Sequence, residues 1–242
     1  MKLSNTLLII VSCFLLTGCL YPEERLQKNT IPYNDQIQAV QTSIDQYQQD
    51  TNGLLPIKTR DMSTPIYQKY PIDFSALIPK YMAEPPGTAY ETGGIYQYVL
   101  VDVEEDPKVK LIDLRMAEEI HELNVKLNVY RQANGYPPFK DVITNEIYTL
   151  DYEKLGYKED PMVESPYSGE LLPLVIDKDA QIYVDYRIDL NQALQDHGNN
   201  NYKQGDDIRG ILVREYQFVP AYSLPYTIDS KGEPMFLIET NK

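Results

Sequence analysis

Cysteine is almost absent from this 242-residue chain, and both copies, Cys13 and Cys19, lie within the first twenty residues. Everything after Cys19 therefore lacks a thiol, which excludes a disulfide framework and a zinc site built on cysteine ligands. Tryptophan is absent too, whereas tyrosine occurs 21 times, so core boundaries and ligand grooves must be built from tyrosine. We expect the hydrophobic core alone to stabilise the fold.

Positive charge is also scarce. The chain has 22 lysines and arginines against 36 aspartates and glutamates, a formal net charge of −14. Such a surface is repelled by nucleic-acid phosphates and by anionic lipid headgroups. We therefore expect no nucleic-acid partner, and attachment to a membrane cannot come from a basic patch.

Histidine occurs twice, and neither residue belongs to a catalytic or metal-binding pattern. His121-Glu122 begins like the zinc-protease motif His-Glu-x-x-His, but position 125 is valine. His197 precedes Gly198 near a predicted helix end, where the helix dipole favours an imidazolium. Nucleophile motifs and phosphate-binding glycine loops are missing from the sequence. The sequence therefore predicts no enzyme, no cofactor and no metal site.

Carboxylates are numerous but match no ligand pattern. Asp177-Lys178-Asp179 starts like an EF-hand loop, yet Ile182 and Ile188 stand where glycine and glutamate are required. A carboxylate pair could hydrolyse glycosides, and the candidates are Asp102, Glu104, Glu105, Asp106, Asp177, Asp179, Asp206 and Asp207. Nothing in the sequence selects two of them. We expect the aspartates at hairpin turns to bond their own backbone, which explains them without a metal.

The first twenty residues carry the most specific motif. Lys2 gives a charged start, and residues 7–16 form an apolar run, interrupted only by Ser12, that is too short to span a bilayer. The run ends in Leu16-Thr17-Gly18-Cys19. This tetrapeptide resembles the lipobox of bacterial lipoproteins, in particular Gram-positive lipoproteins of the Bacillus type that are often labelled solute-binding proteins of ABC transporters.

The resemblance implies that residues 1–18 are a signal peptide that is removed, and that Cys19 receives a diacylglyceryl thioether and becomes the acylated N-terminus. Acyl chains bind a membrane with ~0.8 kcal/mol per buried methylene, so two of them make a durable anchor. We then expect the protein on the extracytoplasmic face of the cell membrane. The alternative is an uncleaved N-terminal anchor with an incidental cysteine. Residues 19–34, with Pro22, Pro32 and few apolar side chains, are predicted to be a flexible tether.

Two later segments share one helical pattern. The apolar positions are Ile37, Val40, Ile44 and Tyr47 in the first segment and Ile120, Leu123, Leu127 and Tyr130 in the second. This spacing places each set on one face of a helix. Each helix is expected to stop at an asparagine–glycine pair followed by proline, because glycine suits the left-handed residue beyond a helix end. The pairs are Asn52-Gly53 and Asn134-Gly135.

The similarity continues in the same order downstream. Three pairs of segments correspond: Asp73-Phe74 with Leu77 to Asp151-Tyr152 with Leu155; Gly94 and residues 99–102 to Gly169 and residues 174–177; and residues 111–114 to residues 187–190. Order preserved over several blocks is unusual for chance similarity. We therefore predict an α+β fold of tandem duplicated helix–loop–β-hairpin units, in which each loop is an irregular, proline-rich middle.

The predicted units are residues 35–113 and residues 114–189, followed by a partial third unit, residues 190–242. In the third unit we expect a short helix over 190–196, strands at 211–213 and 216–219, and a C-terminal hairpin between residues 224 and 238, because strand, polar glycine-containing turn and strand follow one another there.

These features favour a membrane-anchored, non-catalytic binding or interaction module whose partner is a protein, a wall polymer or a small solute. The alternative is the solute-binding lipoprotein of an ABC transporter, and a wall hydrolase lacks any positive motif. The seam between the two predicted helices, marked by Tyr47 and Tyr130, is the expected place for a ligand, although both tyrosines also suit a core.

Overall fold

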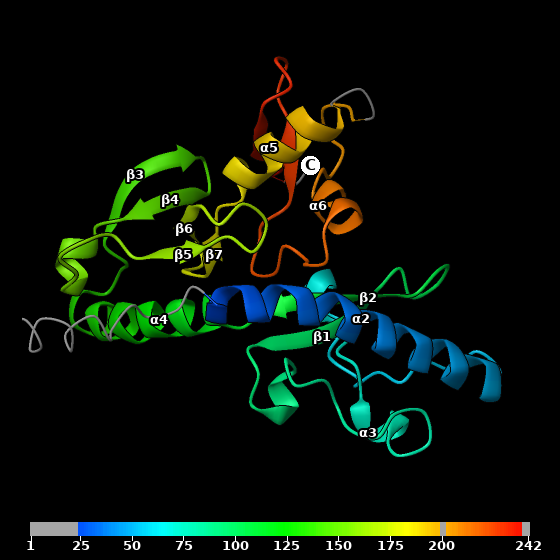
Figure 1. Ribbon diagram of the computed structural model, residues 1–242. Coiled ribbons are helices and arrows are strands. Elements are labelled where there is room, and N and C mark those ends of the chain that lie inside the picture. The colour runs from blue at the N-terminus through cyan, green and yellow to red at the C-terminus, as the bar shows by residue number, and fades with distance from the viewer. Residues whose placement is uncertain (1–23, 199–201, 239–242) are drawn as a thin grey trace, which may run out of the picture. The chain divides into compact units, whose positions relative to one another are not determined.

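The computed structural model describes residues 24–198 and 202–238. Its helices and strands follow the order α2(Glu24–Asp50), η1(Ile66–Gln68), α3(Phe74–Leu77), η2(Tyr90–Thr92), β1(Tyr96–Val101), β2(Lys108–Asp113), α4(Arg115–Asn134), β3(Phe139–Thr144), β4(Ile147–Leu150), η3(Tyr152–Leu155), β5(Met162–Glu164), β6(Leu171–Asp177), β7(Ile182–Val184), α5(Arg187–His197), α6(Gly210–Glu215), β8(Tyr226–Ile228) and β9(Pro234–Phe236) (Figure 1). The chain is α+β, as predicted. It divides into two compact units, residues 1–36 and residues 37–242, and we call the second the main body.

Helix α2 begins earlier than expected. It starts at Glu24, so the prediction of a flexible tether is wrong for residues 24–34, while residues 19–23 and Cys19 lie outside the described residues. Good helix formers from Glu24 to Lys28 outweigh the single interior Pro32, whose missing N–H removes one helical hydrogen bond. Within the main body the predicted apolar face is confirmed, because Ile37, Val40 and Ile44 are buried.

The helix ends are confirmed as well. Asn52 and Gly53 follow α2 with φ of 57° and 92°, and Gly135 caps α4 with φ of 84°, its N–H donating to the carbonyl of Arg131. A side chain at such a φ is strained, which is why glycine stands there. On α4 the predicted positions Ile120, Leu123 and Leu127 are buried, so this face packs into the core.

The short turns after each long helix also match. Asp73 accepts a hydrogen bond from the backbone N–H of Ser75 and precedes α3, and Asp151 precedes η3. Their apolar partners are all buried: Phe74, Leu77, Tyr152 and Leu155. Both stretches are therefore buried helical turns that follow an aspartate, but α3 is α-helical and capped by the Asp73 side chain, whereas η3 is a 3₁₀ turn without a side-chain cap.

The second sheet is larger than predicted. Its order is β3-β4-β6-β5, with β7 paired to β6, so the expected irregular middle of the second unit contains the hairpin β3–β4. Val142, Ile143 and the run from Ile147 to Leu150 are β-prone and flank the polar turn at Asn145 and Glu146. Register shifts within the hairpin break the strict alternation of apolar residues, which is the signal that sequence analysis relies on.

Three Asp-x-Arg junctions recur at helix starts. In each, the carboxylate of the aspartate accepts a hydrogen bond from the backbone N–H of the arginine two residues later. It also accepts hydrogen bonds from the guanidinium of that arginine, with Nη2–Oδ2 distances of 2.5, 2.6 and 2.6 Å. The pairs are Asp113–Arg115, Asp185–Arg187 and Asp207–Arg209. Bidentate, charge-assisted pairs of this kind fix geometry strongly.

These junctions correct the predicted register of the duplication. Residues 111–113 end strand β2, whereas residues 187–190 lie inside helix α5, so matching these two segments is wrong. Asp185 corresponds better to Asp113, since Asp113 ends β2, Asp185 directly follows β7, and each opens a helix. The boundary predicted between residues 189 and 190 also falls within α5. The turn between β1 and β2 is longer than the turn between β6 and β7, so the two predicted units fall out of register when their sequences are matched.

The C-terminal part is partly as predicted. The short helix appears as α5, which ends at Gly198 with φ of 91°, and β8 and β9 form the C-terminal hairpin. The strands expected at residues 211–213 and 216–219 are wrong, because Ile211, Leu212 and Val213 belong to α6 and residues 216–219 form only an isolated bridge, between Phe218 and Leu111. Ile211 and Leu212 pack into a large core cluster and Val213 into a small one, so the helix is apolar on two sides. A short apolar run that shows neither helical nor strand periodicity is compatible with both structures.

The segment 216–222 connects the hairpin β1–β2 with the hairpin β6–β7. The N–H of Leu111 on β2 donates to the carbonyl of Gln217 (2.9 Å), and the N–H of Val219 donates to the carbonyl of Leu111 (3.0 Å). The N–H of Val184 on β7 donates to the carbonyl of Tyr222 (2.9 Å). One stretch of backbone therefore bonds to the second strand of each hairpin, which brings them into a single main body.

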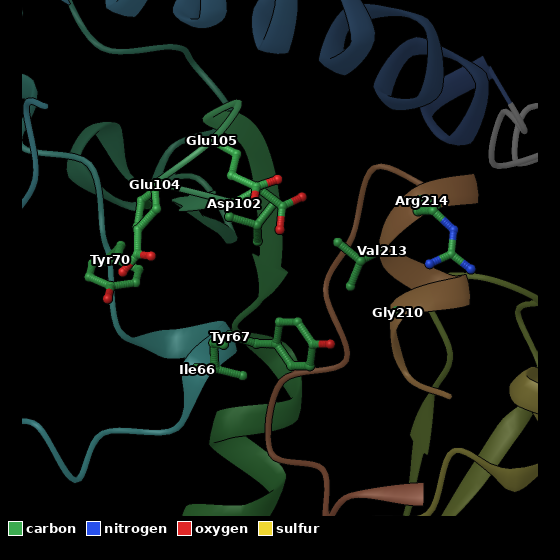
Figure 2. Close-up of a pocket in the computed structure, with 11 residues that line it drawn as sticks. Ile66, Tyr67, Tyr70, Asp102, Glu104, Glu105, Gly210, Val213 and Arg214 are labelled. Atoms are coloured by element: carbon green, nitrogen blue, oxygen red, sulfur yellow. The ribbon is translucent and has the colours of Figure 1, made fainter. Parts of the chain in front are cut away.

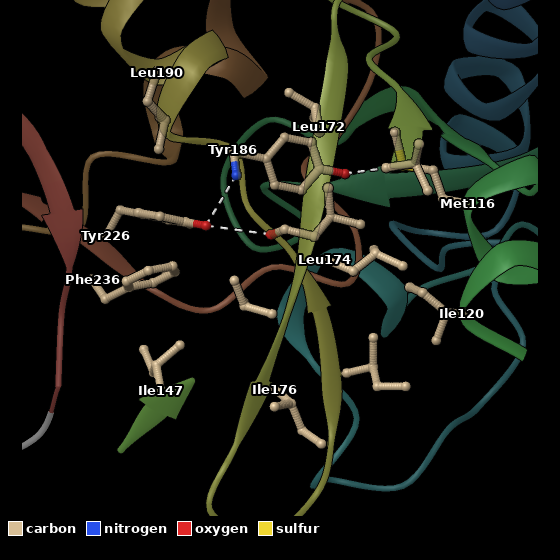
Figure 3. Close-up of a cluster of buried hydrophobic side chains, with 14 of the residues drawn as sticks. Met116, Ile120, Ile147, Leu172, Leu174, Ile176, Tyr186, Leu190, Tyr226 and Phe236 are labelled. Atoms are coloured by element: carbon tan, nitrogen blue, oxygen red, sulfur yellow. Dashed lines mark hydrogen bonds between the residues drawn. The ribbon is translucent and has the colours of Figure 1, made fainter. Parts of the chain in front are cut away.

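Tyr186 joins this segment to the core. Its side chain is fully buried, and its hydroxyl donates to the carbonyl of Ala221 (2.9 Å) and lies 3.1 Å from the sulfur of Met116 (Figure 3). Its backbone N–H donates to the hydroxyl of Tyr226 (3.0 Å). Burial raises the pKa of both phenols well above the ordinary value, so they remain neutral donors and acceptors.

We expect Tyr186→Phe to lower the free energy of unfolding by about 1–3 kcal/mol, because the buried carbonyl of Ala221 loses its donor. Urea denaturation of the variant and the parent measures the difference. Tyr136→Phe is the control, since Tyr136 is 61% exposed and the same atom is removed there into water. Equal stability of the two variants would contradict the assigned role of the Tyr186 hydroxyl.

Candidate functional site

A cavity of about 580 Å³ opens on the main body between three segments that are distant in the sequence. It is lined by Ile66, Tyr67 and Tyr70; by Val101, Asp102, Val103, Glu104 and Glu105; and by Gly210, Val213 and Arg214 (Figure 2). We call it the tyrosine groove. Its volume lies within the range of small-molecule pockets, and it combines apolar, aromatic and charged walls as such pockets do.

The aromatic wall is formed by η1 and the residues after it. Pro65 precedes η1 with φ of −53°, which presets the helical turn, and this turn presents Tyr67 to the groove. The ring of Tyr67 packs against the small core cluster, and the guanidinium carbon of Arg209 lies 5.1 Å from the ring centre. Burial raises the pKa of Tyr67 to about 12, so its hydroxyl is neutral and can donate a hydrogen bond.

The acidic wall is the turn between β1 and β2, and Asp102 begins it in an unusual backbone conformation. Its φ is 52°, a left-handed value that aspartate adopts at some cost. The carbonyl of Asp102 accepts the N–H groups of Glu105 (3.2 Å) and Asp106 (3.0 Å). The backbone of the turn is thus held through this carbonyl oxygen and not through the carboxylate.

The hairpins β6–β7 and β8–β9 use their aspartates differently. The carboxylate of Asp177 accepts N–H groups at 2.8 and 2.9 Å from its own turn, and that of Asp229 does the same. The N–H groups of Glu233 and Lys231 lower the pKa of Asp229. The expectation that turn aspartates bond their own backbone is therefore confirmed for Asp177 and Asp229. It is wrong for Asp102, because in this longer turn the N–H groups of Glu105 and Asp106 bond the backbone carbonyl of Asp102 and not its carboxylate.

The groove carboxylates lack counter-ions among the residues that the structure describes. Asp102, Glu104 and Glu105 form no ion pair there, whereas Asp106 in the same turn pairs with Lys108 at 2.7 Å. Figure 2 shows the carboxylates of Asp102 and Glu105 pointing toward the space that Val213 faces from α6. Three carboxylates therefore line the groove without an ion pair in the described part of the chain, although Lys110 interacts electrostatically with Asp102.

The nearby cations are occupied by other partners. Arg214 donates to the hydroxyl of Tyr202 and lies 5.7 Å from that ring centre, so it points away from the carboxylates (Figure 2). Lys110 donates to the carbonyl of Tyr216 (2.6 Å), and burial lowers its pKa. Arg209 is paired with Asp207. The lining therefore carries three carboxylates and one guanidinium, that of Arg214, and this excess of negative charge favours a cationic group.

The remaining candidate residues lie elsewhere. His121 is exposed on α4, and His197 lies 3.4 Å from Glu215, with no serine bonded to either ring in the described residues. Asp206 accepts the N–H of Lys203 (2.8 Å), and Asp177 and Asp179 belong to the β6–β7 turn. Within residues 24–198 and 202–238, no group of three or more histidine, cysteine or acidic side chains is arranged to hold a metal.

The two tyrosines that mark the expected ligand seam make packing contacts, as the core alternative predicts. Tyr47 packs edge-on against Tyr81 with ring centres 5.5 Å apart, and Tyr130 packs against the large core cluster. Neither lines the tyrosine groove. Sequence analysis identified the three groove carboxylates only as members of a larger set, and it did not identify Tyr67, Tyr70 or α6. Their approach depends on tertiary pairing that no sequence pattern records.

A second buried polar cluster surrounds Asp189 on α5. Its carboxylate accepts hydrogen bonds from the hydroxyls of Ser165 (2.8 Å) and Ser168 (2.6 Å), and the residue is only 2% exposed. Burial raises its pKa, since the hydroxyls offset only part of the lost hydration. Both hydroxyls donate to the same carboxylate, so the cluster anchors the β5–β6 turn.

Asp189 gives a pH dependence of unusual sign. Its pKa is higher in the folded than in the unfolded chain, so protonation favours folding and the ionised form costs stability. We expect the parent to gain stability relative to Asp189→Asn as the pH falls from 7 through the raised pKa toward 3.8. Urea denaturation at several pH values measures this gain, and a tenfold difference in proton affinity between the folded and unfolded chains corresponds to ~1.4 kcal/mol. Asp61→Asn on an exposed loop controls for removal of a charge, and a difference that shrinks on acidification would contradict the argument.

Comparison with known proteins gives one match. Residues 33–113 match the YphF family N-terminal domain, which is about a third of the chain. The matched segment ends with strand β2 and contains the aromatic and acidic walls of the groove, but not α6. No curated protein and no solved structure matches the chain. In the part of the chain that the structure describes, no helix has the length and apolar character needed to cross a membrane.

Proposed function

We propose that this chain is a lipid-anchored extracytoplasmic lipoprotein that acts as a non-catalytic binding or interaction module, with the tyrosine groove as its binding site. The observation that carries the proposal is the combination of the sequence Leu16-Thr17-Gly18-Cys19 with a groove whose carboxylates have no counter-ions in the described part of the chain. The motif resembles a lipobox and supports the location. The groove supports the activity.

Anchoring depends on Cys19 in this proposal. The chain carries an excess of 14 negative charges, so electrostatics gives it no affinity for anionic headgroups. Residues 1–18 are removed, and the acyl chains on Cys19 then hold the protein on the outer face of the cell membrane. The helical start of α2 at Glu24 leaves only a few residues between this cysteine and the first described turn.

A binding role fits the contents of the groove better than catalysis. Aromatic and aliphatic side chains line it together with carboxylates, and neither histidine of the chain is among its lining residues. The three carboxylates lie on one short turn and not on opposite sides of the cavity, so they do not flank a bond as the acids of a glycosidase must. They are arranged to attract a positive charge.

The second candidate function is solute binding for an ABC transporter. The volume of the groove, about 580 Å³, favours it because that space suits a small molecule. A solute that binds only the folded state raises the melting temperature as its concentration increases above the dissociation constant. A thermal-shift screen against amines, amino acids and sugars therefore separates a solute receptor, which responds, from a module that binds macromolecules only.

We expect Cys19→Ala to abolish stable membrane attachment, because a single substitution removes the whole anchor. Fractionation of cells that express the full chain, with metabolic labelling by a fatty acid, measures attachment and acylation. Cys13→Ala is the matched control and should stay attached and labelled, since it lies in the apolar run that is removed. Cys19→Ala protein that still partitions with membranes after loss of residues 1–18 would reject the anchoring role.

A further inference from the structure

We infer that the tyrosine groove is the docking site for a basic segment of a partner protein, with a lysine or arginine side chain entering between the acidic turn and α6. This inference rests on the proposed function and deepens it, because it names the class of partner. The occupant is a positively charged polypeptide.

The acidic wall supplies the charge complementarity. Asp102, Glu104 and Glu105 line the groove and have no ion pair among the described residues, whereas Asp106 on the same turn is paired with Lys108. The three unpaired acids of this turn line the groove, whereas its paired acid, Asp106, does not. Solvation of the turn alone does not account for this division. An ammonium or guanidinium is the group that such a wall stabilises.

The other walls accept the aliphatic stem of a long cationic side chain. Tyr67 and Tyr70 give the groove aromatic surface, and Val101 and Val213, which belong to one buried cluster, give it apolar surface. Lysine and arginine bury their methylene stems against such surfaces while the charged end reaches polar groups. Tyrosine faces also attract a cation directly. The groove therefore fits both parts of the side chain.

The groove also discriminates against other partners. Three carboxylates against one guanidinium, that of Arg214, give the groove lining a net negative charge that opposes an anionic ligand. Like charges placed opposite one another raise the free energy of a complex and so exclude acidic segments.

The apolar surface continues beyond the cavity. Ile66 lines the groove and is 61% exposed, so it extends the apolar wall outward from Tyr67. A single amine or amino acid would leave this side chain in water, whereas a polypeptide that enters the groove through one residue can cover it with the next. The exposed isoleucine therefore favours a segment over a small cation.

The test measures binding of the purified full-length mature protein to the peptide acetyl-Lys-Lys-Lys-amide by titration calorimetry at low salt. We expect binding that weakens as salt is added, and no binding of acetyl-Glu-Glu-Glu-amide. Asp102→Asn and Glu105→Gln should each weaken binding about two- to fivefold, the effect of a partly exposed ion pair. The triple variant Asp102→Asn, Glu104→Gln, Glu105→Gln should weaken it more than about tenfold.

The matched control is Asp106→Asn, which removes the same charge from the same turn but outside the groove. It should leave the affinity within about twofold of the parent. Equal weakening by Asp106→Asn and Asp102→Asn would reduce the effect to net charge and overturn the docking site. Unchanged affinity in the triple variant, or equal affinity for cadaverine and the peptide, would overturn it as well, the latter in favour of a small-amine receptor.

These experiments can reject the anchoring proposal and the docking proposal independently of each other. The titration uses protein in solution, so it does not depend on whether Cys19 holds the chain to a membrane. Attachment lost in Cys19→Ala with no peptide binding in the parent rejects the docking site alone. Peptide binding in a chain that remains on membranes without Cys19 rejects the anchoring alone.

Discussion

The backbone pairing of residues 216–222 with strands β2 and β7 is the constraint on which the rest of the main body depends. Helix α6 ends at Glu215, immediately before this segment, and Lys110 on β2 bonds the carbonyl of Tyr216. The position of α6 opposite the β1–β2 turn is therefore fixed by hydrogen bonds to β2 itself. The groove exists because residues 216–222 bond to strands β2 and β7, which belong to two hairpins that lie earlier in the sequence.

The Asp-x-Arg junctions show how one local solution serves different surroundings. Asp113 and Asp185 are almost completely buried while their arginines are about half exposed, whereas Arg209 is the more buried partner of its pair. In the first two junctions the guanidinium neutralises a buried acid, and in the third a carboxylate neutralises a buried arginine beside Tyr67. Breaking any of the three would leave an uncompensated charge in the interior.

The sequence was sufficient for elements whose signal is local. The faces of α2 and α4, the glycines that end them and the C-terminal hairpin follow from spacing and turn chemistry, and all are present. The hairpin β3–β4 was missed because bulges disturb its alternation, and α6 was taken for a strand because two core clusters bury both its sides. The groove was beyond sequence analysis, since α6 lies more than a hundred positions away from the other two walls.

The division of the groove between the matched domain and the remainder of the chain has a consequence for selectivity. Residues 33–113 contribute the tyrosines and the carboxylates, and α6 contributes the facing wall from outside that domain. If the groove binds a basic segment as proposed, changes confined to α6 alter the shape of the space while the carboxylates that attract the positive charge stay in place. Selectivity among such partners then depends on a six-residue helix whose position is held by the pairing of residues 216–222 with β2.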